Sequence, residues 1–325
     1  ARRTARFFYA LMLVRANASV PQPARTQYLA GLDMVSLGSE RGERGLSYTP
    51  CLEKTAPECF MVRQHVTAIY DYKDFIFASI RREFEVTYLN SALGAIWTII
   101  HPLALITIYA VVFSKIMQAR LPAFDGPYAY SVYLCTGILL WTLFSEIALK
   151  AQVVFIEQAN LLKKVNFPRL CLPIVVVGNG LIRFGIIAAI FAGFLALTGL
   201  LPGLVALALL PIIALTAWFA IALGLWLGIL NVFFRDVGHF FSVVLQFWFW
   251  LTPIVYPASV LPDRAQELIA FNPLATLVMA AQTVVLQQTW PDWRALAWVL
   301  AIAVVLSAVT VRLYLRRGPE MQDEL

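Results

Sequence analysis

Long uncharged stretches limit what this chain can fold into more than any other feature. Between Leu170 and Phe234 it carries one charged residue, Arg183, and between Val86 and Ser114 it carries none. A helix of about 20 residues, rising about 1.5 Å per residue, crosses the roughly 30 Å hydrocarbon core of a bilayer, so both stretches are long enough to span. The chain is 60% hydrophobic and 14% charged, whereas soluble domains are about 45–50% apolar and about 25% charged. We therefore expect an all-α protein with several transmembrane helices.

Six membrane spans account for the apolar segments. Pro202 and Gly203 divide the longest uncharged stretch into two, because both residues interrupt helices. The expected spans lie at about residues 93–117, 130–149, 172–198, 204–232, 240–255 and 293–315.

Residues 70–90 have the pattern of an amphipathic helix. Their apolar residues recur at helical spacing, with charged residues on the other side. These apolar residues are Phe75, Ile76, Ile80, Phe84 and Tyr88. Because a span follows at once, we expect this helix to lie in the membrane interface.

The beginning of the chain does not share the membrane pattern. Residues 1–69 contain many arginines and a Gly/Ser-rich stretch, without a sustained hydrophobic period. We expect residues 1–69 to form a poorly structured extension, with Met61 as a candidate natural start. Residues 70–317 would form the membrane domain and 318–325 a short cytoplasmic tail.

The segment at 274–288 is weakly apolar, and the distribution of basic residues decides how it is interpreted. Lys and Arg mark the cytoplasmic side of a membrane protein. With six spans, the expected cytoplasmic flanks hold Arg81, Arg82, Lys150, Lys163, Lys164, Arg169, Arg235, Arg312, Arg316 and Arg317, and the outer flanks hold Lys115, Arg120, Arg264 and Arg294. A seventh span would move the last three arginines outside. We therefore interpret 274–288 as a re-entrant or interfacial helical element on the outer side, with both chain termini in the cytoplasm.

Motifs of enzymatic sites are missing from the sequence. No GxxxxGK[ST] loop is present to hold ATP phosphates, and neither HExxH nor GxSxG occurs. The four cysteines lack the spacing of a metal site and are interpreted as unpaired, small hydrophobic residues. The sequence favours a protein that is not an enzyme, that holds no cofactor or metal, and that obtains its energy from another chain.

Arg183 is the one charged side chain deep in an uncharged stretch. Placing a guanidinium in hydrocarbon costs at least about 2.5–3.5 kcal/mol, so it needs a partner or a water-filled path. It could contact an anionic group of a substrate. Alternatively it snorkels or pairs with a neighbour such as Asn179, one turn earlier.

Aromatic residues are dense in the first and fifth expected spans. They include Trp97, Tyr109 and Phe113 in the first, and Phe247, Trp248, Phe249 and Trp250 in the fifth. Flat rings can pack on the C–H faces of sugars, so these residues are candidates for the lining of a glycan path. The alternative is that most of them face lipid or protein.

Four segments together resemble one known family. They are residues 86–113 (VTYLNSALGAIWTIIHPLALITIYAVVF), 160–173 (NLLKKVNFPRLCLP), 233–237 (FFRDV) and 271–274 (FNPL). In order and spacing they are similar to the permease subunits of type-2 ABC exporters, which move O-antigen, capsular and teichoic-acid polysaccharides. The likeness covers nearly all of the chain from residue 70 to residue 317.

The resemblance implies a permease in the inner (plasma) membrane of a bacterium that works with a separate ATPase. Two permease copies would form the channel for a lipid-linked glycan, and two copies of a cytosolic ABC ATPase would bind ATP and Mg. Residues 150–170 would then contain the helix that couples to the ATPase. The implied coupling residues are Asn160, Lys163, Lys164, Phe167, Arg169, Arg235 and Asp236. Arg81 and Arg82 would meet lipid headgroups or a substrate pyrophosphate.

Three other functions remain open at this stage. A permease of the same architecture could export a small drug or antibiotic, although the chain has only six Met among its apolar residues. A membrane-embedded glycosyltransferase would need a larger catalytic loop than any loop here. A structural membrane scaffold would leave the charged inner loops without a role.

Overall fold

The computed structural model describes residues 73–88, 100, 103–104, 106–108, 111, 128–159, 171–318 and 320–324. These residues belong to one compact unit, Pro57–Leu325. The expectations for residues 1–69 lie outside the described residues, as does nearly all of the first expected span. The described part is helical with connecting loops and contains no strand, as expected for the all-α class.

Four of the described helices are long and apolar enough to cross a membrane. They are α6 (Ala129–Glu157), α8 (Cys171–Thr198), the pair formed by η3 (Leu204–Ala208) and α9 (Leu209–Phe233), and α13 (Trp293–Arg317). The starts of all four lie within about one residue of the predicted spans. The largest difference is the end of α6, which continues for eight residues beyond the predicted limit at residue 149. Residues 150–157, expected in an exposed loop or a short separate helix, are therefore the last two turns of α6.

The fifth expected span corresponds to a shorter helix. Helix α10 (Asp236–Leu251) has 16 residues and is therefore about 24 Å long, less than the roughly 30 Å hydrocarbon core. It begins and ends four residues before the predicted limits. The number of six spans stays a prediction.

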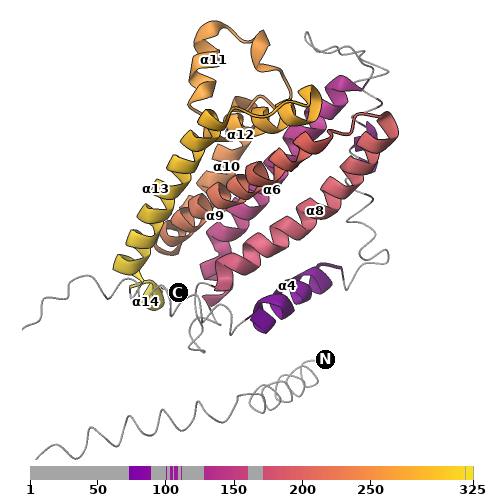
Figure 1. The fold of residues 1–325 in the computed structure, drawn as a ribbon. Helices are drawn as coiled ribbons and strands as arrows, with labels where there is room; N and C mark the ends of the chain where they lie inside the picture. The colour runs from indigo at the N-terminus through magenta and orange to yellow at the C-terminus, as the bar shows by residue number, and fades with distance from the viewer. Residues whose placement is uncertain are drawn as a thin grey trace, which may run out of the picture. The chain divides into compact units, whose positions relative to one another are not determined.

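The segment between α10 and α13 folds back on itself. It holds η4 (Ala258–Val260), α11 (Asp263–Ala270), α12 (Pro273–Gln282) and the π-helical turn η5 (Thr283–Gln287). Helix α11 and the α12–η5 pair meet at 101°. Gln282 donates to the carbonyl of Pro253 at 3.3 Å, and Gln288 donates to that of Leu201 at 3.5 Å. The segment thus begins and ends at the same end of the bundle (Figure 1), which agrees with the re-entrant element predicted for 274–288.

Helix α6 lies at the centre of the bundle and packs against α8, α9, α10 and α12. Glycines allow the close approach of α9. A Cβ at Gly224 would lie 2.7 Å from the carbonyl oxygen of Ala148, and one at Gly228 would lie 2.9 Å from that of Ala151. Such contacts between small residues bring helix backbones together in membranes, where helix packing depends on van der Waals contact.

Two shorter helices flank the bundle. Helix α4 (Lys73–Tyr88) packs against α8, and Ile80 fills the space beside Gly178. Helix α14 (Glu320–Glu324) packs against α9 and buries Met321. The helix expected at 70–90 is thus present as α4, and its position in a membrane interface stays a prediction.

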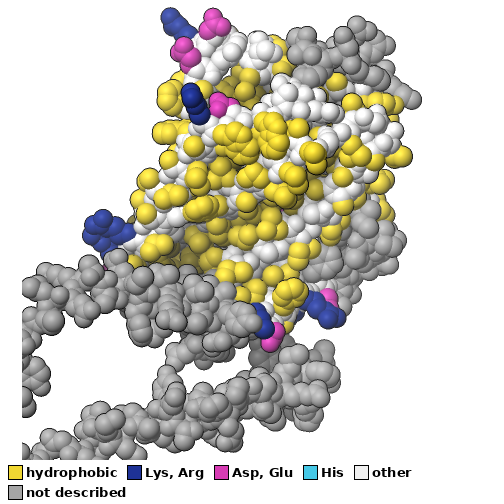
Figure 2. All heavy atoms as spheres, viewed as in Figure 1, with side chains coloured by type: hydrophobic (Ala, Val, Ile, Leu, Met, Phe, Trp, Pro, Cys, Tyr) yellow, Lys and Arg dark blue, Asp and Glu magenta, His cyan; other side chains and the backbone are white. Residues whose placement is uncertain are grey.

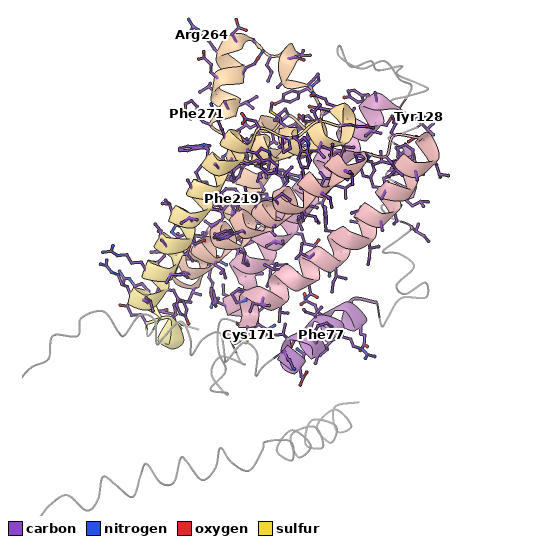
Figure 3. The ribbon with its side chains drawn as sticks, in the orientation of Figure 1. Phe77, Tyr128, Cys171, Phe219, Arg264 and Phe271 are labelled. Atoms are coloured by element: carbon purple, nitrogen blue, oxygen red, sulfur yellow. The ribbon has the colours of Figure 1, made fainter. Side chains whose placement is uncertain are left out.

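Hydrophobic side chains cover the middle of the bundle, and charged side chains gather at its two ends (Figure 2). We name the ends after Cys171 and Arg264, which lie at opposite ends (Figure 3). This distribution is that of a protein whose middle faces hydrocarbon.

Candidate functional site

Three helices are joined by ionic groups near the Cys171 end. Nη1 of Arg183 on α8 lies 2.8 Å from Oε1 of Glu146 on α6, with both side chains mostly buried. Glu83 on α4 accepts a hydrogen bond from Asn179 on α8 at 2.5 Å and lies 3.7 Å from Lys150 on α6. The groups thus tie α4 and α8 to α6.

These contacts bear on the two interpretations of Arg183. Its partner is Glu146 on the neighbouring helix, and Asn179 is engaged by Glu83 instead. A charge taken out of water is tolerated when an opposite charge and hydrogen bonds replace the water. The ion pair accounts for the presence of Arg183 in an apolar helix, and an anion contact with a substrate stays a prediction.

An open cavity of about 540 Å³, lined by both apolar and charged residues, lies beside this cluster, between the ends of α6 and α9 and the start of α10. Its lining includes Glu146, Gln152, Glu157, Asn231, Arg235 and His239. The side chain of Gln152 is buried, and its Nε2 has no hydrogen-bond partner. The cavity therefore combines carboxylates and cations, and a buried amide nitrogen without a partner lies in the same residue group.

The aromatic residues of α10 point in different directions, some outward and one inward. Phe247 and Trp250 are 67% and 62% exposed, on the outer surface of the helix. Trp248 points inward, where its ring packs edge-on against Phe144 and its Nε1 donates to Oδ1 of Asn272 at 3.0 Å. Phe247 and Trp250 are therefore available to line a path, whereas Trp248 serves the internal packing.

Asn272 connects α10 to the re-entrant segment. Its Oδ1 caps α12 by accepting from the amide of Leu274 at 3.1 Å as well as from Trp248. Its Nδ2 lies 3.3 Å from the hydroxyl of Thr252. Asn272 is half-buried, and polar groups of a membrane protein that are shielded from water need such partners. The sequence indicated an outer element at FNPL but not this role of Asn272.

The other predicted site residues fall into two groups. Arg81, Arg82, Arg235 and Asp236 are exposed, and Arg81 pairs with Glu85 at 2.7 Å. Asp236 lies in the first turn of α10, where a carboxylate is favourable. Outside the described residues are Trp97, Tyr109, Phe113, Asn160, Lys163, Lys164, Phe167 and Arg169.

Sequence reasoning missed Glu146, Gln152 and Asn231. Glu146 lies inside the predicted second span, and a lone acid there together with a lone arginine in the next span was a usable signal for an ion pair. No pattern distinguishes Gln152 and Asn231 in the sequence. Among the described residues, no three His, Cys, Asp or Glu side chains are grouped as a metal site requires.

The fold and this distribution of charge define a multi-pass, helical membrane protein. The family model for ABC-2 type transporters matches residues 74–286. The chain belongs to this family, whose members are the membrane subunits of transporters.

Curated relatives carry more specific names. An O-antigen export system permease protein RfbA of Myxococcus xanthus is 27% identical over 80% of this chain and 98% of its own length. A protein of the same name from Klebsiella pneumoniae is 30% identical over 64% of this chain and 78% of its own length. This chain is similar to both over most of their length.

Proposed function

We propose that this chain is the permease subunit of an ATP-driven exporter that moves a lipid-linked polysaccharide across the inner membrane of a bacterium. The similarity to O-antigen export permeases over nearly the whole length of one relative carries the proposal. A cytosolic ABC ATPase would supply the energy in two copies, holding ATP and Mg in its own sites.

The distribution of basic residues supports an orientation with the Cys171 end in the cytoplasm. That end holds Lys150 on α6, Arg235 just before α10, and Arg312, Arg316 and Arg317 on α13, whereas the opposite end holds Arg264 and Arg294. Basic residues are retained on the cytoplasmic side during insertion. The C-terminus would then be cytoplasmic, and α4 would lie at the inner surface, with Arg81 and Arg82 able to meet anionic headgroups.

The exposed surface of α10 supports a path formed by two permease copies. Phe240, Val243, Phe247 and Trp250 are all exposed along this helix. Two copies that face each other across α10 would enclose a path with aromatic walls. Aromatic rings stack on sugar rings without selecting one kind of sugar, and the passage of a repeating polymer requires this tolerance.

The coupling segment would transmit ATPase movement to α6 and α8. Residues 160–170 connect these two helices, which the Arg183–Glu146 pair also joins. A push on the segment would therefore move α6 and α8 together as a rigid body.

The test is purification of the chain from its native membrane in mild detergent, followed by identification of the retained proteins and an ATPase assay. We expect a co-purifying ABC ATPase whose activity rises with the lipid-linked glycan of the same cell. Phe167→Ala should lose the ATPase, and Arg264→Ala at the other end is the matched control. Stimulation by drugs alone would favour a drug exporter, and the absence of any ATPase would refute the proposal.

A further inference from the structure

Three arginines lie on the last two turns of α13, and they differ in their partners. Arg317 forms an ion pair with Glu320 at 2.6 Å. Arg312 and Arg316 are exposed, and neither side chain forms an ion pair or a hydrogen bond with another residue that the structure describes. Figure 2 shows dark blue atoms that stand out from the side of the bundle at this end of α13. Within the described part of the chain, two positive charges are thus left without a counter-charge.

The spacing of Arg312 and Arg316 allows both to act on one anion. Residues four apart lie on the same face of a helix, with about 5–6 Å between their Cβ atoms. A guanidinium presents its N–H donors in a planar fork that matches a phosphate. Two guanidiniums on successive turns can therefore reach one phosphate from two sides.

The two arginines end an exposed face of α13 whose other members are apolar. Residues seven and then four positions apart share a helix face, and α13 has two adjacent rows with this spacing. All members of the two rows are exposed, namely Val304, Val311 and Leu315 in the first and Val305, Arg312 and Arg316 in the second. Helix α13 is long and apolar enough to cross a membrane. The valines would therefore face acyl chains, and the guanidiniums, on their long apolar stems, would reach the headgroups.

We propose that Arg312 and Arg316 bind the phosphate of an anionic phospholipid whose acyl chain lies along the exposed valines of α13. Two guanidiniums attract a headgroup with net negative charge, and they repel the cationic group of a zwitterionic one. A carboxylate of a partner protein could meet the two charges, but it would leave the apolar rows uncovered. In the orientation proposed above, the lipid belongs to the inner leaflet. The inference goes beyond the proposed function, because lipid binding at α13 requires neither the glycan nor ATP hydrolysis.

The test uses the full chain purified in mild detergent with the proteins that it retains. The probes are phosphatidylglycerol, which is anionic, and phosphatidylcholine with the same acyl chains. Native mass spectrometry counts the bound lipid over a range of lipid concentrations. We expect the wild type to bind phosphatidylglycerol more tightly than phosphatidylcholine.

Substitution of both arginines should remove this preference. Arg312→Gln together with Arg316→Gln should weaken phosphatidylglycerol binding about thirtyfold, because each basic residue near an anionic surface contributes a factor of about five. Each single variant should lose about fivefold, which gives a second measurement. The Tm in lipid-free detergent should not fall, since neither side chain has a partner among the described residues. Arg264→Gln together with Arg294→Gln removes the same charge from the opposite end and is the matched control.

Four results would overturn the inference. The first two are equal binding of the two lipids by the wild type, and unchanged phosphatidylglycerol affinity in the Arg312 and Arg316 double variant. The third is an equal loss in the control variant, because net charge alone would then attract the lipid. The fourth is loss of a retained ATPase with unchanged lipid binding, which would assign the arginines to a protein contact. The lipid measurements involve neither glycan nor export, so failure of this inference is distinguishable from failure of the proposed function.

Discussion

The guanidinium of Arg183 on α8 and the carboxylate of Glu146 on α6 are 2.8 Å apart, and both side chains are less than one-third exposed. The pair joins the two helices that flank the coupling segment. Each charge satisfies the other in a region where hydration is restricted. Substitution of either residue alone leaves an unpaired charge between α6 and α8.

We expect Arg183→Leu or Glu146→Leu alone to destabilise the protein by about 3–5 kcal/mol, and the double variant to lose much less. Thermal unfolding in detergent and a double-mutant cycle would measure this difference. Additive losses would contradict the ion-pair role. If Arg183 instead contacts a substrate anion, the double variant should fold well and still fail to export.

Gly224 sets the distance between α6 and α9. A Cβ at this position would lie 2.7 Å from the carbonyl oxygen of Ala148. Gly224→Ala should therefore cost about 1–3 kcal/mol through overpacking, seen as a lower Tm. Gly185→Ala on α8 is the matched control, because a Cβ there has no neighbour within 4 Å. Equal Tm values for the two variants would exclude tight packing at Gly224.

The sequence predicted some helix ends better than others for a physical reason. Helix α8 begins where an uncharged stretch begins and α13 begins two residues before one, so their starts were predicted within one residue. The end of α6 was missed because Lys150 and Glu157 resemble loop residues. In the structure Lys150 lies near Glu83 and Glu157 lines a cavity, so polar partners let a helix continue past its apolar part.

The roles of neighbouring aromatic residues were harder to predict than the helix itself. Phe247, Trp248 and Trp250 look alike in composition, and successive residues of a helix differ by about 100° in direction. Only the rotation of α10 against α6 shows that Trp248 points inward. The Arg183–Glu146 pair likewise required knowledge that α6 and α8 are neighbours.

Asn272 should be important for the re-entrant segment. Asn272→Ala removes the cap of α12 and the acceptor of Trp248 together. Loss of an N-cap costs about 0.5–2 kcal/mol, and the unpaired donor of the half-buried Trp248 costs up to about 1 kcal/mol more. Thermal unfolding should show a lower Tm. Asn272→Asp keeps both acceptor roles and should be milder; equal losses in the two variants would assign the effect to the Nδ2 contact with Thr252.

Substitutions of the aromatic residues on α10 distinguish the exposed rings, which could line a glycan path, from the inward ring, which packs in the core. Trp248→Ala should cost about 3–5 kcal/mol, because the inward ring leaves a cavity beside Phe144. Phe247→Ala and Trp250→Ala remove exposed rings and should shift stability by less than about 1 kcal/mol.

If these rings line the glycan path, both variants should nevertheless reduce export in cells at normal protein levels. Phe271→Ala, another exposed ring outside α10, is the control. Undiminished export in the Phe247 and Trp250 double variant would mean that this surface faces lipid, because stacking on two rings cannot be lost from a path without slowing passage of the sugar chain.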